Sequence, residues 1–161
     1  TGTPTGSKYV RDDGTLQTVS VPITVTNVPF EADGSTNVTI SSSYNYMIMW
    51  VFQASTSPAS ITLAVNNPDV YLYDTNTTTK PITIVATSGN NQAKHGQLLL
   101  FFQTANLVHF TSDAWTETGT ESAGTATKHI GYMQGETITT LTFTHEAVAG
   151  GNISVYQLSK S

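Results

Sequence analysis

The chain has no cysteine, and only 11% of its 161 residues carry a charge. The lack of cysteine excludes disulfide bonds, thiolate metal sites and cysteine nucleophiles. Globular domains ordinarily have about a quarter charged residues, so threonine, serine, asparagine and glycine must keep this surface soluble. The net charge of −5, without a basic patch, argues against nucleic acid and anionic membranes as partners.

Long hydrophobic runs are also missing. No apolar stretch approaches the roughly 18 residues of a membrane-spanning helix, so we expect no membrane insertion. The chain does not open with a basic and then apolar signal segment, so we expect a mature protein, an excised domain or a protein that is never secreted. No apolar pattern holds a helical period over three turns, and we therefore expect no substantial helix.

Short alternating apolar runs, bounded by Gly, Asn and Pro turns, fill the chain instead. Val21, Ile23 and Val25 alternate with polar residues, which predicts a half-buried strand, and Pro22 favours an edge position for it. Further strands are expected at residues 37–40, 46–52, 61–65, 70–73, 82–85, 98–102, 107–110, 138–144 and 153–158. The pattern predicts one all-β domain, an antiparallel β-sandwich or jelly roll of roughly eight to ten strands.

Two of these runs, residues 46–52 and 98–102, are apolar at every position or nearly so. A strand of an antiparallel sandwich normally turns one polar face to water. Something must therefore cover the second face of these strands. The runs are either central strands covered within the domain or part of a subunit interface, and the sequence leaves both interpretations open.

Residues 112–136 depart from the strand pattern, because they are rich in Thr, Gly and Glu and contain Trp115. The segment predicts a long polar loop, and loops of this length are uncommon unless they are functional or disordered. Trp115 would be either an anchor buried in the core or an exposed platform for a ligand.

Residues 6–15 read GSKYVRDDGT, which resembles the short connector of tailed-phage tail-fibre proteins, with Leu16 where the family usually has Trp. The resemblance implies that residues 1–18 are a connector from a fibre shaft and that residues 19–161 are a β-sandwich tip domain. It also implies a homotrimer on a virion tail fibre or another extracellular fibre. Predatory bacteria with borrowed fibre genes are an alternative source.

Catalytic patterns are not evident in the sequence. The four histidines have no metal-ligand spacing, and His109, in an apolar run, is expected to be a core or interface histidine. The acidic pairs Asp12 with Asp13 and Glu117 with Glu121 lie in polar stretches where nothing would raise a carboxyl pKa. We therefore expect no enzymatic activity, no metal and no cofactor.

Recognition is the remaining function class. Aromatic faces and amide or hydroxyl groups bind sugars, and the candidates in expected loops are Tyr44, Asn90, Asn91, Trp115 and Tyr132. The leading hypothesis is a non-catalytic receptor-binding tip of a trimeric fibre, which attaches to a bacterial surface glycan or outer-membrane protein. The alternative is a structural trimerisation cap, or a viral spike or decoration module, without its own ligand.

Overall fold

The computed structural model describes residues 8–10, 13–18, 23–31, 34–54, 59–65, 69–73, 77–79, 82–88, 93–116, 125–135, 137–145 and 148–160. Every regular element among them is a β-strand, and every strand pairing is antiparallel. In this part of the chain no helix is long and apolar enough to cross a membrane. The all-β antiparallel prediction is thus confirmed.

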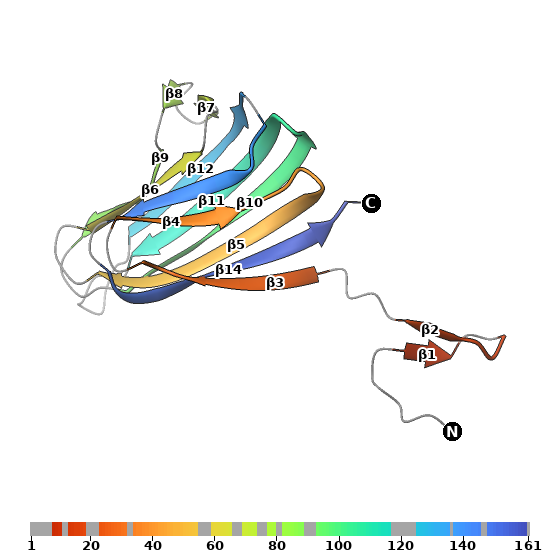
Figure 1. Ribbon diagram of the computed structural model, residues 1–161. Coiled ribbons are helices and arrows are strands. Elements are labelled where there is room, and N and C mark those ends of the chain that lie inside the picture. Colours follow the sequence, from red (N-terminus) through yellow and green to blue (C-terminus); the bar gives the residue numbers. More distant parts are fainter. Residues whose placement is uncertain are drawn as a thin grey trace.

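One long sheet of eight strands forms the larger layer of the molecule (Figure 1). In spatial order its strands are β3 (Ile23–Pro29), β14 (Val148–Ser159), β5 (Tyr44–Ala54), β10 (Ala93–Thr104), β11 (Leu107–Thr116), β12 (Thr125–Gln134), β7 (Asp69–Leu72) and β8 (Thr77–Thr79). β3 is an edge strand, as expected, although Pro22 itself lies outside the described residues.

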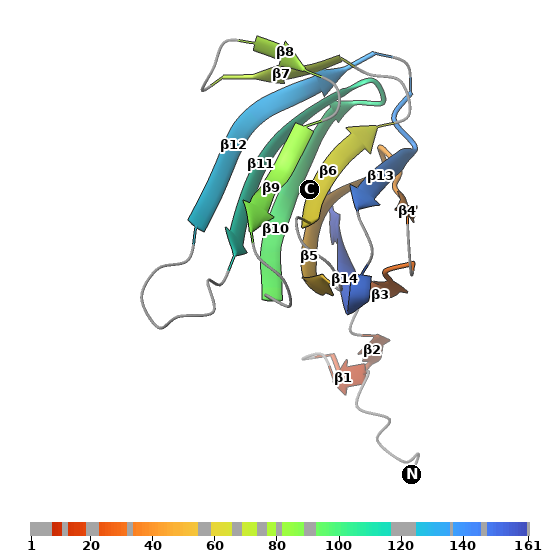
Figure 2. The ribbon, with the colours of Figure 1, turned by 90° about the vertical axis from the view of Figure 1, so that its left-hand side faces the viewer.

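A shorter sheet of four strands packs on one face of the long sheet, which makes a sandwich (Figure 2). In spatial order its strands are β4 (Gly34–Thr39), β13 (Thr140–His145), β6 (Ala59–Val65) and β9 (Ile82–Ser88). The chain passes repeatedly from one sheet to the other, for example from β3 to β4 and from β13 to β14.

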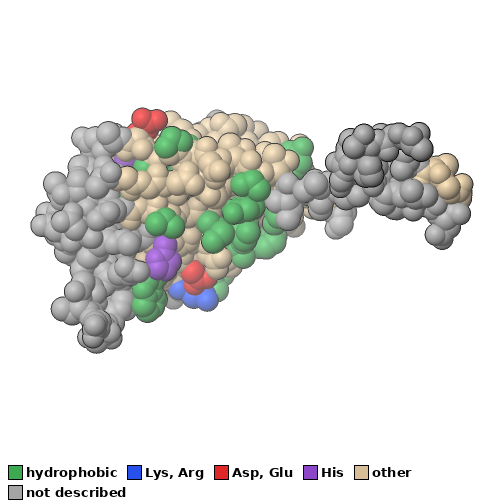
Figure 3. Space-filling view, turned by 90° about the horizontal axis from the view of Figure 1, so that it is seen from below, with side chains coloured by type: hydrophobic (Ala, Val, Ile, Leu, Met, Phe, Trp, Pro, Cys, Tyr) green, Lys and Arg blue, Asp and Glu red, His purple; other side chains and the backbone are tan. Residues whose placement is uncertain are grey.

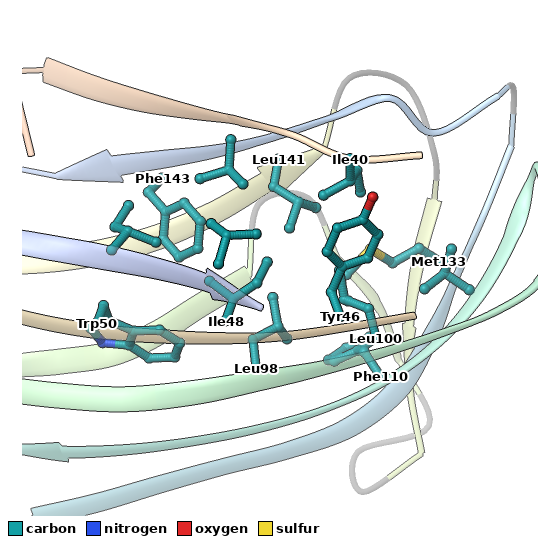
Figure 4. Packing of buried hydrophobic residues seen from close by; sticks show 14 of the residues in the cluster. Ile40, Tyr46, Ile48, Trp50, Leu98, Leu100, Phe110, Met133, Leu141 and Phe143 are labelled. Carbon is teal, nitrogen blue, oxygen red and sulfur yellow. The ribbon is translucent and has the colours of Figure 1, made fainter. Parts of the chain in front are cut away.

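The core lies between the two sheets and is built from alternate residues of the facing strands (Figure 4). Trp50 of β5 and Phe143 of β13 meet across it with ring centroids 6.0 Å apart. Leu98 and Leu141 are fully buried beside them. Burial of each such side chain contributes about 1.5–3 kcal/mol, and this packing must supply the stability in a chain without disulfides.

The structure contradicts the long polar loop predicted at residues 112–136. β11 continues to Thr116, and β12 occupies residues 125–134. The inward positions of β12 include Gly131 and Met133, both buried. A side chain at position 131 would collide with the Tyr71 carbonyl of β7, so glycine permits the close pairing of β12 with β7. Gly131 and Met133 are the two buried positions among the described residues of β12, and Gly131 has no side chain, so the strand shows little apolar pattern in the sequence.

A two-stranded hairpin stands apart from the sandwich, towards the N-terminus (Figure 1). β1 (Lys8–Val10) pairs with β2 (Leu16–Thr18). The turn contains Gly14 with φ of 80°, a backbone conformation that favours glycine. Asp13 Oδ1 accepts hydrogen bonds from the Thr15 hydroxyl and backbone N–H, and these bonds lower the pKa of the Asp13 carboxyl. The predicted connector therefore contains a hairpin.

Fourteen strands lie in the described residues, more than the eight to ten expected. The strands without a counterpart in the sequence prediction are β1, β2, β8 and β12. β1, β2 and β8 have three residues each, too few to display a period of two.

Candidate functional site

The face of the long sheet that points away from the four-stranded sheet is here called the outer face. On β5, Tyr46, Ile48, Trp50 and Phe52 are buried, whereas Met49 and Val51 are 42% and 58% exposed. On β10 the same alternation buries Leu98 and Leu100 but leaves Phe101 48% exposed. Both apolar runs are therefore central strands, but no described residue forms a second layer over their outer positions. Among the described residues, Met49, Val51 and Phe101 on their outer face are exposed, and the choice between core and subunit interface for this face stays a prediction.

An apolar row crosses the outer face at right angles to the strands. The strand registers align Val25, Tyr156, Met47, Leu99, Thr111 and Ile130, which lie on β3, β14, β5, β10, β11 and β12. Thr111 alone interrupts the row. With neighbouring strands about 4.8 Å apart, it spans about 24 Å. Figure 3 looks onto the molecule from this side and shows hydrophobic side chains gathered there.

A groove with a volume of about 730 Å³ lies on the outer face, next to the apolar row. We call it the outer groove. Its lining side chains include Met49 and Val51 of β5, His95 and Gln97 of β10, and Asp113 and Trp115 of β11. On the registers, Val51 is opposite His95, which is opposite Trp115. The volume is typical of sites for small ligands.

The wall of the groove along β14 is polar. Ser154 donates its hydroxyl to Asn27 Oδ1 at 2.9 Å, and Asn152 Nδ2 donates to Ser154 Oγ at 3.2 Å and Asn27 Oδ1 at 3.4 Å. These bonds use the Asn152 amide group as a donor. The network fixes the orientation of Asn152 and leaves its carbonyl oxygen as an acceptor at the groove.

Charge in the groove is balanced. Asp113 Oδ1 lies 3.4 Å from Lys128 Nζ of the paired strand β12. Both side chains are well exposed, so this ion pair contributes at most about 1 kcal/mol to stability. Its main consequence is local, because the Lys128 ammonium offsets the Asp113 carboxylate.

The five residues expected to bind a ligand do not form one site. Trp115 lies on the strand β11 and is 41% exposed, so it is not a buried anchor. Tyr132 stacks on Tyr71 with ring centroids 4.6 Å apart. Trp115 pairs with Ala126, six residues from Tyr132, or about 20 Å along the strand. The two aromatic side chains therefore cannot share a small ligand.

The other expected site residues have separate positions. Tyr44 begins β5 and is exposed, with its ring 6.4 Å from that of Tyr46. Tyr44 is not among the residues that line the outer groove. Asn90 and Asn91 lie outside the described residues, as do the acidic candidates Asp12, Glu117 and Glu121.

His109 was expected in the core or an interface, and the core interpretation is wrong. It is exposed on the outer face, with Nε2 3.3 Å from Gln103 Oε1. The histidine that does lie in the core is His145, which is 4% exposed. No group of three or more His, Cys, Asp or Glu side chains in the described part of the chain could hold a metal ion.

Sequence reasoning missed most of the groove. Gln97 and Asn152 were assigned to no site, and Met49 and Val51 were considered only as interface or core. The available signal was the alternation of the strands. Met49 and Val51 are next to Trp50, and Gln97 is next to Leu98, so a period of two puts all three on the face opposite the core. That period alone could not place β14 beside β5, because the two strands are about a hundred residues apart.

No protein-family model matches the chain, and no curated protein sequence matches it. Among solved structures, the chain is similar to one of infectious bursal disease virus strain Gx, with 15% identity and a TM-score of 0.29 over 95% of this chain. A structure of the viral particle has 14% identity and a TM-score of 0.24 over 91% of this chain. A structure of strain Gt has 12% identity and a TM-score of 0.23 over 95% of this chain. The chain spans 46%, 42% and 46% of those viral chains. At these TM-scores the likeness is weak.

Proposed function

We propose that this chain is a structural jelly-roll module of a virus-type particle or fibre, which assembles with copies of itself into a trimer and performs no catalysis. It would serve as a trimerisation cap, a spike or a decoration module. The observation that carries the proposal is the open apolar row on the outer face. The strand order and residues 6–15 support it independently.

The strand order supports the jelly-roll assignment. The core strands are β3-β14-β5-β10 in one sheet and β4-β13-β6-β9 in the other. This is the order of an eight-stranded jelly roll, with β11, β12, β7 and β8 added beyond β10. Jelly rolls are common in viral capsids and also in lectins and cupins. The fold therefore narrows the function classes but does not choose among them.

The apolar row supports self-assembly. Two members of the row, Val25 and Ile130, are 49% and 44% exposed. Four further exposed large hydrophobic side chains lie elsewhere on the same outer face; they are Met49, Val51, Phe101 and Trp115. Contiguous apolar surface of this kind marks interaction sites in soluble proteins. A second copy of the chain presents the same surface, and a closed ring of three would place the three rows around one axis.

Sedimentation velocity at tens of micromolar tests the assembly. Leu99→Asp introduces a charge into the middle of the row, whereas Thr39→Asp introduces the same charge at an exposed position of the other sheet. We expect a trimer for the wild type and for Thr39→Asp, and a monomer with an unchanged circular dichroism spectrum for Leu99→Asp. A monomeric wild-type protein would overturn the proposal.

A second candidate function is attachment to a bacterial surface glycan or protein, as a receptor-binding tip. The outer groove favours it, because a purely structural module does not need a groove that combines an exposed tryptophan with amide groups. Attachment would be compatible with assembly, since three weak sites on one particle bind more tightly than one.

Absence of catalysis is part of the proposal. The one described carboxylate in the groove, Asp113, is paired with Lys128. The described lining contains no second Asp or Glu that could act with Asp113 as a catalytic acid pair. Release of reducing ends from host polysaccharide by the purified chain would contradict this part.

A further inference from the structure

We propose that the outer groove binds a neutral oligosaccharide, with a sugar ring stacked on Trp115 and its hydroxyls bonded by Gln97, Asp113 and Asn152. This inference deepens the second candidate function, attachment, and does not depend on the trimer. It assigns the ligand class from the chemistry of the groove.

The apolar part of the groove fits the C–H face of a sugar. Trp115 is 41% exposed and Val51 is 58% exposed, and His95 of β10 lies between them on the registers. Met49 lies two residues before Val51 and extends the apolar surface. These side chains belong to paired strands of one sheet, so they are held as a fixed platform. A ring stacked on an indole contributes on the order of 1 kcal/mol beyond area burial.

The polar groups lie beside this platform and line the same groove. Gln97 is the register partner of both Met49 and Asp113, so an amide and a carboxylate adjoin one another across β10 and β11. Within the described residues, the Gln97 amide has no hydrogen-bond partner. Asn152, on the far wall, donates its Nδ2–H groups to Ser154 and Asn27, which leaves its side-chain Oδ1 as an acceptor. The groove therefore offers the acceptors Asp113 and Asn152 and both amide functions of Gln97.

The charge balance favours a neutral sugar over an anionic one. The described lining contains Asp113 and no Lys or Arg, and the nearby Lys128 ammonium is engaged by Asp113 at 3.4 Å. A carboxylated or sulfated glycan would meet this carboxylate, and the described lining offers it no Lys or Arg as a partner. A purely apolar peptide would in turn leave Gln97 and Asp113 without partners, which costs free energy when such groups are buried.

A glycan array that holds neutral, carboxylated and sulfated oligosaccharides tests the ligand class. Trp115→Ala removes the platform, and Phe101→Ala is the matched control, because Phe101 is a similarly exposed aromatic on the same face but outside the groove. We expect binding to neutral glycans, about tenfold weaker in Trp115→Ala and unchanged in Phe101→Ala. Gln97→Ala provides a second variant if Trp115→Ala fails to fold.

Several results would overturn the inference. These are preference for anionic glycans, binding to no glycan, or neutral-glycan binding that Trp115→Ala and Gln97→Ala both leave intact. Attachment to host cells that survives periodate oxidation of their glycans would assign the groove to a protein partner instead. A protein that forms trimers but binds no neutral glycan would refute this inference and leave the proposed assembly standing.

Discussion

The indole of Trp50 occupies the space into which a side chain at Gly96 would project. The two residues are register partners on β5 and β10. A Cβ placed on Gly96 would collide with Cζ2 and Cε2 of the indole and would come within 2.5 Å of the Asp113 carbonyl oxygen of β11. The ring therefore lies flat beneath β10 and reaches Phe143 of the opposite sheet.

Gly96→Ala should consequently destabilise the fold. Overpacking of a core costs about 1–3 kcal/mol, and here one of the two obstacles is backbone, which cannot rotate away. Urea unfolding measures the free energy. Gly150→Ala is the control, because nothing lies within 4 Å of a Cβ at that position, and it should change stability little. Equal stability of Gly96→Ala and wild type would show that the indole moves readily.

Ile48 and Met49 are adjacent in sequence but point to opposite faces of the long sheet. Ile48 is fully buried, and Met49 is 42% exposed. Ile48→Asp should prevent folding, because an unpaired charge in the core costs several kcal/mol. Met49→Asp should keep the β-sheet circular dichroism spectrum. Loss of the fold in both variants, measured at a concentration where the wild type is monomeric, would mean that Met49 is also core.

The run Tyr46–Met47–Ile48–Met49–Trp50 illustrates how far sequence reasoning reaches. Its apolar character predicted either a central strand or a subunit interface, and the structure places it as a central strand of the long sheet. It could not reveal which face was open, since Met47 and Met49 are as hydrophobic as Ile48. That distinction comes from the position of the second sheet, which packs on only one face of the first.

The sequence identified one residue of the outer groove, Trp115, but not the residues that lie beside it. Trp115 was singled out as either a buried anchor or an exposed platform, and it is exposed; it was paired with Tyr132, because both were expected in one loop. The real neighbours of Trp115 are His95 and Val51, which come from strands distant in the sequence. Long-range pairing depends on the complete order of the sheet, and a period of two says nothing about that order.

Tyr46 should make the protein less stable at alkaline pH. Burial raises the pKa of its hydroxyl above the ordinary 10.0, and the hydrogen bond from the Ser41 N–H opposes this effect. Below pH 10 both folded and unfolded chains keep the proton, so this contribution is fully present. As pH rises, the unfolded chain ionises first, and stability falls until the folded pKa is passed.

Tyr46→Phe tests this effect by urea unfolding at several pH values. The variant should lose about 0.5–1.5 kcal/mol at neutral pH, because Ser41 N–H loses its acceptor, and its stability should decline less steeply above pH 10. Tyr73→Phe changes an exposed ring and should leave the neutral-pH stability unchanged. A parallel decline in wild type and Tyr46→Phe would contradict the assignment.

The Thr36 side chain should stabilise the segment that connects β3 to β4. Its hydroxyl accepts the Glu31 N–H at 3.0 Å and lies 3.2 Å from His145 Nε2, and Thr36 and His145 are 2% and 4% exposed. Thr36→Val keeps the side-chain volume but removes both bonds, which should cost about 1–3 kcal/mol. Thr36→Ser keeps the hydroxyl and loses one methyl group, so its cost should be smaller. Amide hydrogen exchange distinguishes loss of the hydroxyl hydrogen bonds from loss of methyl packing. The Glu31 amide should exchange faster in Thr36→Val and at the wild-type rate in Thr36→Ser, whereas acceleration in both variants would attribute the effect to packing instead of the hydroxyl.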